Sequence, residues 1–413
     1  MRLLENIGCL ATCRSDGGQG DIHPVADAAL VWQGDTIAWA GPRGELPAAY
    51  AGAERLDAGG RLVIPGLVDC HTHLVFGGWR AEEFEQRILG RSYLEIAAAG
   101  GGIARTMRLT RAASDAELIQ RASGVLAEML TLGVTTVECK SGYGLDRAHE
   151  LRILQLYRDL AGRQPIRLVP TFLGAHVVPP EFRDDRAGYL TLLIDDLLPT
   201  VARERLAVFC DVFVERSAFT VEDARRLLRA AQALGLGAKL HADQLSAGGG
   251  AELAAEIGAV SADHLECASD AGMAAMATAG VVAVSLPIAS LYLSQLPLAA
   301  RRWIGAGVPV AVATDFNPGS APSYDLPLAL TLACTLQRMT PAEALKGATV
   351  VAARAVGLAS RIGSLEPGKA ADFALIEAPD VNHWLYHHRP NACVATVVGG
   401  RVRWSRDGGL PID

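Results

Sequence analysis

Eight short apolar runs that alternate with helical patterns constrain the fold of this chain more than any other feature. The runs are "LVDCHTH" (67–73), "VTTVECK" (134–140), "IRLVPTFL" (166–173), "AVFCDVFVE" (207–215), "LGAKLHA" (236–242), "AVSADHLE" (259–266), "VVAVSLP" (281–287) and "VPVAVATD" (308–315). Continuous apolar runs are typical of parallel strands buried on both faces, which are joined by helices. Eight of them predict a (β/α)8 barrel. The alternative, a doubly wound open sheet, lacks the support of a glycine-rich dinucleotide motif.

Helix-start signals lie between these runs. They are Ser114 with Glu117, Thr220 with Asp223, and Thr340 followed by Pro341. A Ser or Thr three residues before an acidic side chain predicts an N-cap, and Pro favours the first helical turn. The signals therefore support helices as the connections between the strands.

Both ends of the chain contain strand-like stretches joined by turns, without the helical patterns of the middle. Strand-like stretches are "ALVWQGDTIAWAG" (29–41), with Gly34 and Asp35 at the bend of a hairpin, "ADFALIEA" (371–378), and "CVATVVGGRVRWSRDG" (393–408), with Gly-Gly at a turn. We expect residues 1–64 and 365–413 to form one small β-sandwich-like domain. The barrel would then occupy residues 65–364.

Composition limits the classes of partner. Half of the 413 residues are hydrophobic and the net charge is −7, so the chain lacks a basic footprint for nucleic acid. No apolar run is long enough to predict a membrane span, and the N-terminus lacks the pattern of a secretory signal. The eight cysteines form no C-x-x-C pair, which favours reduced thiols and a cytoplasmic location.

Polar residues gather where the predicted strands end, which is where (β/α)8 barrels carry function. Five of the ten histidines lie there, and chance would scatter them among helices and loops. Taken one at a time, each of these polar residues could have a structural role and no functional one. Asp315 could cap a turn, Lys140 could pair with a carboxylate, and Glu215 could be the buried partner of such a charge.

The two histidines of "HTH" are the sharpest local signal. Residues i and i+2 of a strand point to the same face, so His71 and His73 present two imidazoles together. Hydrogen-bonded core histidines would be the structural alternative. A third histidine and an aspartate on the same rim would complete a set of N and O ligands for a divalent metal with an open position.

Three motifs resemble the metal-dependent amidohydrolase superfamily: "PGLVDCHTHL", "KLHADQ" and "ATDFNPGS". The resemblance implies a (β/α)8 barrel beside a small β-domain built from both chain ends. Longer stretches are similar to the imidazolonepropionase family within it. They are residues 71–103, "ECKSGYGL" (138–145), "TFLGAHVVPPE" (171–181), "KLHADQLS" (239–246) and "ATDFNPGSAP" (313–322). This similarity implies hydrolysis of 4-imidazolone-5-propanoate to N-formimidoyl-L-glutamate in histidine degradation, by a homodimer.

The resemblance also implies roles for individual residues. His71, His73, His241 and Asp315 would hold one Zn or Fe ion per subunit, and that ion would activate a water. Asp315 would take the proton of this water, and His264 would stabilise the charge that develops on the ring oxygen. Either of the two would return a proton to the leaving nitrogen.

Further residues would bind the anionic small-molecule substrate. The expected set is Arg80, Tyr143, His176, Gln244, Asn317, Gly319 and Ser320. Arg80 would grip the propionate through its guanidinium group. Asn317, the backbone of Gly319 and the hydroxyl of Ser320 would hold the newly formed carboxylate.

Two departures from related patterns refine this expectation. Strand four ends in Glu215 and not in the lysine that bridges two metals in many relatives, which favours one metal. Gln244 stands where deaminase-like relatives carry a glutamate, and an amide cannot act as a base. The rivals are a two-metal hydantoinase-like or dihydroorotase-like enzyme, a deaminase, and a barrel that binds ligand without turnover.

Two segments remain outside these roles. The glycine-rich stretch 97–111 is either a flexible connection or a lid, and the sequence does not decide between them. The histidines of "HWLYHHR" (383–389) are expected at the surface or in a contact between domains.

Overall fold

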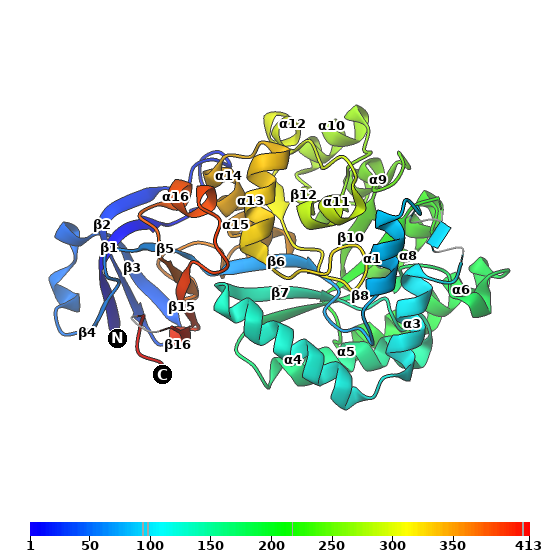
Figure 1. The fold of residues 1–413 in the computed structure, drawn as a ribbon, viewed down its shortest axis with the longest axis horizontal. Helices are drawn as coiled ribbons and strands as arrows, with labels where there is room; N and C mark the ends of the chain where they lie inside the picture. The colour runs from blue at the N-terminus through cyan, green and yellow to red at the C-terminus, as the bar shows by residue number, and fades with distance from the viewer. Residues whose placement is uncertain (93–94, 97–98, 217, 407–408) are drawn as a thin grey trace.

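The computed structural model describes residues 1–92, 95–96, 99–216, 218–406 and 409–413. Figure 1 shows two parts side by side: a larger body of strands surrounded by helices, and a smaller sheet that contains both chain termini.

The larger body is a barrel of eight parallel strands. They are β6 (Leu67–Thr72), β7 (Val134–Lys140), β8 (Arg167–Ala175), β9 (Phe209–Val214), β10 (Gly237–Ala242), β11 (Ser261–His264), β12 (Val282–Ser285) and β13 (Val310–Val312), paired in chain order. A bridge between Thr72 and Phe316 joins the first strand to the segment after the last. Two backbone hydrogen bonds reinforce the closure, from His73 N to Phe316 O (2.8 Å) and from Asp315 N to His71 O (3.0 Å). The predicted (β/α)8 barrel is confirmed, with one strand in each of the eight runs.

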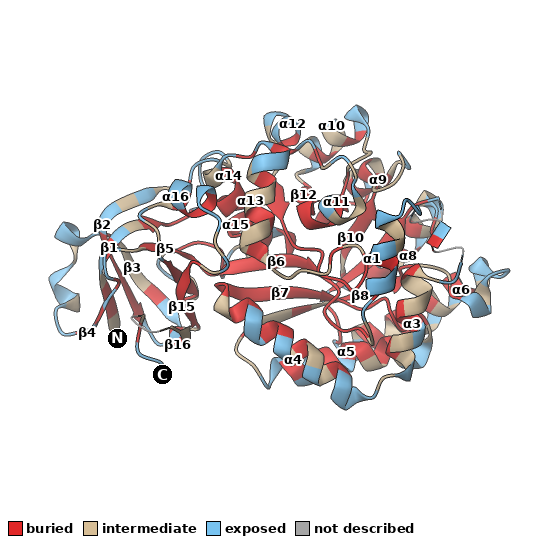
Figure 2. Ribbon diagram, viewed as in Figure 1, coloured by how far each residue is buried: buried red, intermediate tan, exposed pale blue. Residues whose placement is uncertain are grey.

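The strands of the barrel are buried along almost their whole length. Every residue of β6, β7 and β9 is buried. Figure 2 shows β6 and β7 as buried strands between helices with exposed outer faces. Because each strand faces helices on one side and the barrel interior on the other, its sequence is apolar on both faces.

Helices follow the strands and cover the barrel. Their bounds are α1 (Ala81–Ile88), α3 (Gly102–Ala112), α4 (Asp115–Thr131), α5 (Arg147–Ala161), α6 (Arg186–Leu192), α7 (Leu198–Arg203), α8 (Val221–Ala233), α9 (Gly250–Glu256), α10 (Asp270–Ala279), α11 (Pro287–Leu293), α12 (Ala300–Gly305), α13 (Leu326–Gln337), α14 (Pro341–Gly347) and α15 (Val350–Ala355). A π-helical segment (Leu193–Leu197) joins α6 to α7, and a 3-10 turn (Pro180–Phe182) precedes α6. Among the described residues, no helix is both long and apolar enough to span a membrane.

The expected helix starts are confirmed at all three positions. Capping boxes connect Ser114 with Glu117, Thr220 with Asp223, and Thr340 with Glu343, with Pro341 in the first turn. In each box the hydroxyl accepts from the backbone N–H three residues on, which satisfies a donor that the helix leaves unpaired.

The smaller sheet takes strands from both ends of the chain. They are β1 (Arg2–Ala11), β2 (Pro24–Gln33), β3 (Thr36–Pro42), β4 (Glu54–Asp57), β5 (Leu62–Pro65), β14 (Phe373–Ile376), β15 (Cys393–Val398) and β16 (Arg401–Ser405). Their order is β16-β15-β14-β5-β1-β2-β3, with β4 also paired to β1. Two 3-10 turns (Arg43–Glu45 and Ala48–Tyr50) lie between β3 and β4.

This sheet folds over on itself, as expected of a sandwich-like unit. Trp32 of β2 and Phe373 of β14 meet edge to face with ring centroids 5.2 Å apart, and Thr36 forms a bridge with Ala370. The two hairpins turn at Gly34 and Asp35 and at the Gly-Gly pair after β15. The domain boundaries at 64/65 and 364/365 stay a prediction.

The two undecided segments take different forms. From residue 102 onward, the glycine-rich stretch belongs to helix α3 (Gly102–Ala112), while positions 97–98 lie outside the described residues. In "HWLYHHR", helix α16 (Val381–Tyr386) carries an exposed His383 whose ring pairs with Asp380 at 2.9 Å. His387 and His388 are exposed as well, which fits the expectation of a surface segment.

Candidate metal centre and substrate cavity

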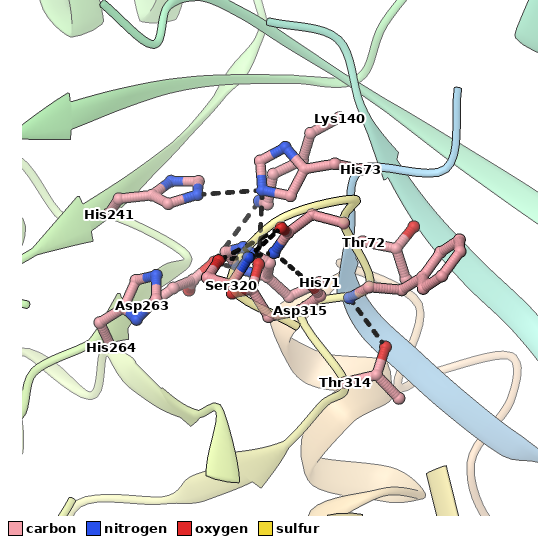
Figure 3. Close-up of polar contacts among 12 residues, drawn as sticks. His71, Thr72, His73, Lys140, His241, Asp263, His264, Thr314, Asp315 and Ser320 are labelled. Atoms are coloured by element: carbon pink, nitrogen blue, oxygen red, sulfur yellow. Dashed lines mark hydrogen bonds and ion pairs between the residues drawn. The ribbon is translucent and has the colours of Figure 1, made fainter. Parts of the chain in front are cut away.

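Five of the predicted residues meet at the carboxyl ends of the barrel strands. His71 is the penultimate residue of β6, His73 follows β6, His241 lies in β10, His264 ends β11 and Asp315 follows β13. Figure 3 shows their side chains close together, with His71 and His73 from the end of one strand and the other three from other parts of the barrel. Among the described residues, two overlapping groups have ligand atoms close enough for one cation: His71, His241 and His264, and His71, His73 and Asp315.

The distances define a small polar centre. His71 Nε2 lies 3.3 Å and His73 Nε2 3.5 Å from Asp315 Oδ1, and the Nε2 atoms of His73 and His241 are 3.4 Å apart. His71 is fully buried, and its Nε2 makes no hydrogen bond to any described residue. A buried nitrogen without a hydrogen bond, facing a carboxylate and further imidazoles, is a donor set that fits a divalent metal ion.

Carboxylates contact two of these imidazoles at Nδ1, on the side of the ring away from the centre, and orient them. His71 Nδ1 lies 2.6 Å from Asp263 Oδ2, and His241 Nδ1 lies 3.2 Å from Asp211 Oδ1. In the neutral imidazole, a carboxylate beside Nδ1 keeps the proton there and directs the lone pair of Nε2 toward the centre. This is the usual support of histidines that bind metals.

Lys140 connects the two supporting carboxylates. Its ammonium group lies 2.7 Å from Asp211 Oδ2, 3.4 Å from Asp263 Oδ2 and 2.8 Å from Glu138 Oε1, and all four side chains are fully buried. The alternative that Lys140 pairs with strand carboxylates is therefore confirmed. A buried network of this kind is stable only because every charge has a partner.

Glu215 is not part of this network, so the suggestion that it balances the buried lysine is wrong. Its carboxylate accepts hydrogen bonds from Leu245 N (3.0 Å) and Ser246 N (3.2 Å) and from the hydroxyl of Ser246. Glu215 thus holds the loop that follows β10, because two backbone donors there would otherwise lack partners.

The electrostatic setting differs among these side chains. Burial opposes a charge on His71, but the carboxylates of Asp263 and Asp315 raise its pKa to about 9. Burial lowers the pKa of His73 to about 4 and that of His264 to about 3. Burial also disfavours ionised Asp315, yet the adjacent imidazoles of His71 and His73 hold its pKa well below the usual value. At neutral pH the centre therefore contains an ionised carboxylate and a neutral His264.

Backbone strain marks two of these positions. His264 and Leu265 have φ of 77° and 70°, and Asp315 has φ of 55°. Residues with side chains rarely adopt this region, and such strain concentrates at functional sites. Asp315 is held there by the hydrogen bond from its N–H to His71 O, which joins it directly to the strand of the first histidine pair.

A cavity opens over this centre. Its walls include ten of the predicted site residues: His73, Arg80, Tyr143, His176, His241, Gln244, His264, Asp315, Asn317 and Ser320. His71 lies beneath the cavity and Gly319 behind Arg80, so the structure brings the whole predicted set together. Which of these residues bind substrate stays a prediction.

Arg80 is a buried cation on the cavity wall. It is 4% exposed, and its Nε and Nη1 make no hydrogen bond to any described residue. Gly319 lies against the guanidinium, because a Cβ built on Gly319 would come within 1.2 Å of Arg80 Nη2. The Gly319 N–H itself donates to Asn317 Oδ1 at 2.8 Å. In this structure Gly319 therefore contributes space for Arg80, while its backbone donor is already used.

Sequence reasoning missed several members of the site. Asp211 is one, although a charged residue inside the apolar run "AVFCDVFVE" was a usable signal. Phe213, Leu245, Ile103 and Leu293 also line the cavity. Ile103 and Leu293 come from helices α3 and α11. The sequence around an apolar residue in a helix does not indicate which surface that residue will contact.

The same chain is similar to known proteins over most of its length. The sequence profile of the Amidohydrolase family matches residues 62–403. Curated imidazolonepropionases are similar to it. The one from Geobacillus kaustophilus is 48% identical over 92% of this chain and 90% of its own length. The one from Porphyromonas gingivalis is 44% identical over 97% and 96%.

Solved structures share the fold at low sequence identity. A 5-methylcytosine deaminase from Klebsiella pneumoniae aligns with a TM-score of 0.74 at 19% identity, covering 98% of both chains. An atrazine chlorohydrolase from Arthrobacter aurescens aligns with a TM-score of 0.69 at 17% identity over 97% of this chain and 95% of the other. At this identity, the similarity to the solved structures shows a shared fold only. The family profile and the curated relatives show to which family the chain belongs. The chain belongs to the amidohydrolase family and, within it, to the imidazolonepropionases.

Proposed function

We propose that this chain hydrolyses 4-imidazolone-5-propanoate to N-formimidoyl-L-glutamate, a step of histidine degradation. One observation carries the proposal: the ligand atoms of His71, His73, His241 and Asp315 converge at the base of a cavity whose wall holds the buried guanidinium of Arg80. A metal ion held by these side chains could act on the ring amide of the substrate, while the cationic wall could bind its carboxylate.

The proposed metal ligands are His71, His73 and His241 through Nε2, and Asp315 through its carboxylate. We propose one Zn or Fe ion per subunit, because three imidazoles and a carboxylate suit either metal. When bound, such an ion supplies Lewis acidity and lowers the pKa of water from ~15.7 toward ~7. His71 Nε2, buried and without a hydrogen bond, is the atom that supports this role most directly.

Asp315 and His264 are the proposed proton-handling groups. The pKa of Asp315 is held low by the two histidines beside it, so its carboxylate is ionised and can accept a proton from the attacking water. His264 is neutral because burial lowers its pKa, so an N–H of its ring can donate to the carbonyl oxygen as negative charge develops there. Asp315 then passes this proton to the ring nitrogen as the C–N bond breaks, either directly or through His264.

The remaining wall residues would hold the substrate. Arg80 would bind the propionate, because its Nε and Nη1 are buried donors without hydrogen bonds in the described chain. Tyr143, His176 and Gln244 would contact the ring. The ring of His176 stacks on that of His73 with centroids 5.2 Å apart, which fixes its plane beside the metal ligands.

The turn after Asp315 would receive the new carboxylate. Asn317 Nδ2 donates to Asp315 O at 2.7 Å and to Ser320 Oγ at 2.9 Å. Ser320 Oγ lies on the cavity wall and can redirect its proton toward an anion. The Gly319 N–H could bind the new carboxylate only if it divided its hydrogen bond between that carboxylate and Asn317 Oδ1.

Turnover of freshly generated 4-imidazolone-5-propanoate, with metal analysis of the same preparation, tests the proposal. We expect disappearance of the substrate, formation of N-formimidoyl-L-glutamate and about one metal ion per chain. His241→Ala should remove metal and activity together, whereas Arg80→Ala should retain metal and weaken substrate capture.

Other outcomes would favour the rivals. Two metals per chain with preferred turnover of hydantoins would indicate a hydantoinase-like enzyme, and ammonia release would indicate a deaminase. Metal binding without turnover would indicate a barrel that only binds ligand. The homodimer and the cytoplasmic location that the family resemblance implies stay predictions, and light scattering of the purified protein tests the first.

A further inference from the structure

Arg80 is buried beside an acidic residue, Glu83. The two residues stand three apart at the start of α1, and Glu83 is 2% exposed. Arg80 Nε lies 3.5 Å from Glu83 Oε2, which is an ion pair without a hydrogen bond. Glu83 therefore balances part of the buried charge while leaving donors of the guanidinium for a ligand.

The other oxygen of Glu83 holds a different helix. Its Oε1 accepts a hydrogen bond from Gly102 N at 3.1 Å, at the first residue of α3. The backbone at this contact is shaped around the carboxylate. A Cβ on Gly101 would come within 2.9 Å of Glu83 Oε1, and Gly102 has φ of 63°. The N-terminal N–H groups of a helix lack partners within it, so this acceptor anchors α3.

Helix α3 is part of the cavity wall. Ile103, the residue after the anchored one, lines the same cavity as Arg80. One buried carboxylate thus touches both the cation on the wall and the first turn of the helix beside it. A second link between the same helices, from Arg105 to Glu82 at 2.8 Å, is at the surface, where the Glu82 side chain is 66% exposed.

We propose that Glu83 is a positioning residue that sets the affinity of the anion-binding side of the cavity, by fixing the Arg80 guanidinium and the N-terminus of α3 in one arrangement. The proposal rests on the proposed function in one respect: the anion is taken to be the propionate of the substrate. It assigns no chemical step to Glu83.

Glu83→Ala and Glu83→Gln separate the two contacts. Glu83→Ala removes both, and we expect KM to rise at least tenfold while kcat changes less than threefold and the metal content stays constant. Glu83→Gln keeps the size of the side chain and an acceptor oxygen for Gly102 N–H. Its KM should therefore fall between those of the wild type and the alanine variant. Glu82→Gln is the matched control on the same turn, and its KM should stay within twofold of the wild type.

Hydrogen–deuterium exchange of the peptide covering residues 101–112 gives a readout that does not depend on turnover. Exchange should be faster in Glu83→Ala than in the wild type and close to wild type in Glu83→Gln and Glu82→Gln. Unchanged KM and unchanged exchange in Glu83→Ala would overturn the inference, as would an effect of equal size in Glu82→Gln. If the wild type did not turn over the imidazolone, the proposed function would fail, while exchange and the binding of propionate would still test Glu83.

Discussion

Asp263 Oδ2 lies 2.6 Å from His71 Nδ1, although 192 residues separate the two along the chain. The same oxygen faces Lys140 Nζ at 3.4 Å, and Ser261 donates to the other oxygen at 2.7 Å. These contacts hold both oxygens of the Asp263 carboxylate in place, and the carboxylate in turn orients the His71 imidazole. The geometry of the candidate metal centre depends on this pair.

Asp263→Asn should weaken metal binding. The variant retains an oxygen near His71 Nδ1 but loses the charge that makes the imidazole a strong donor, so we expect the metal dissociation constant to rise roughly 10–100-fold. Competition with a coloured chelator measures it. Asp270→Asn is the control, because Asp270 is exposed and pairs only with Arg302 at the surface in the described chain. Equal metal affinity in the two variants would contradict the role of Asp263.

Metal binding should release a proton near neutral pH. Without metal, the adjacent carboxylates raise the pKa of His71 to about 9, so its imidazole is protonated at pH 7 and must lose that proton to bind a cation. Metal affinity should therefore rise ~tenfold per pH unit up to about pH 9. Calorimetric titration in buffers of different ionisation enthalpy measures the released proton, and the same heat in all buffers would contradict this prediction.

The same shift affects the stability of the metal-free protein. His71 has a raised pKa in the folded state, so its contribution to stability is complete below pH 6.5 and is lost as the pH rises through about 9. We expect His71→Asn to reduce the difference in denaturant midpoint between pH 6 and pH 9, measured with metal removed. An unchanged difference would show that other groups dominate this pH range.

Gly319→Ala should impair substrate binding and leave the metal centre intact. A methyl group at Gly319 would overlap Arg80 Nη2, so the guanidinium must move away from its position on the cavity wall. We expect a loss of roughly 100-fold in kcat/KM, mostly through KM, with constant metal content. Gly124→Ala provides a comparison at an open position within α4 and should be active and slightly more stable.

His264→Asn separates two possible roles of this side chain. As a donor to the developing oxyanion, its loss should lower kcat by about 10²–10³ without loss of metal. His264 also belongs to one of the two groups that could hold a cation, with His71 and His241. Metal analysis beside steady-state kinetics distinguishes the roles, since loss of metal from this variant would make His264 a ligand.

Lys140→Met should destabilise the barrel. The substitution leaves Glu138, Asp211 and Asp263 as buried carboxylates without their shared cation, and breaking such a buried network costs about 3–5 kcal/mol. Urea unfolding of the metal-free protein measures the change in the free energy of unfolding. Adding Glu138→Gln should recover part of the loss, and additive effects of the two substitutions would argue against a shared network.

Several parts of this molecule follow from local sequence. Each of the eight apolar runs coincides with a barrel strand to within a few residues, and the capping boxes at Ser114, Thr220 and Thr340 begin helices where expected. His71 and His73 share a face because strand side chains alternate. These features depend on residues within a few positions of one another, so the sequence alone determines them.

The contacts that complete the centre depend on closure of the barrel. Asp211 and Asp263 reach their histidines only because β9, β10, β11 and β6 are brought together around one axis. The same holds for Glu83, whose carboxylate joins α1 to α3, and for Gly319, whose missing side chain makes room for Arg80. Such contacts join residues far apart in the chain. No local periodicity encodes them, and only the tertiary structure decided which carboxylate meets which imidazole.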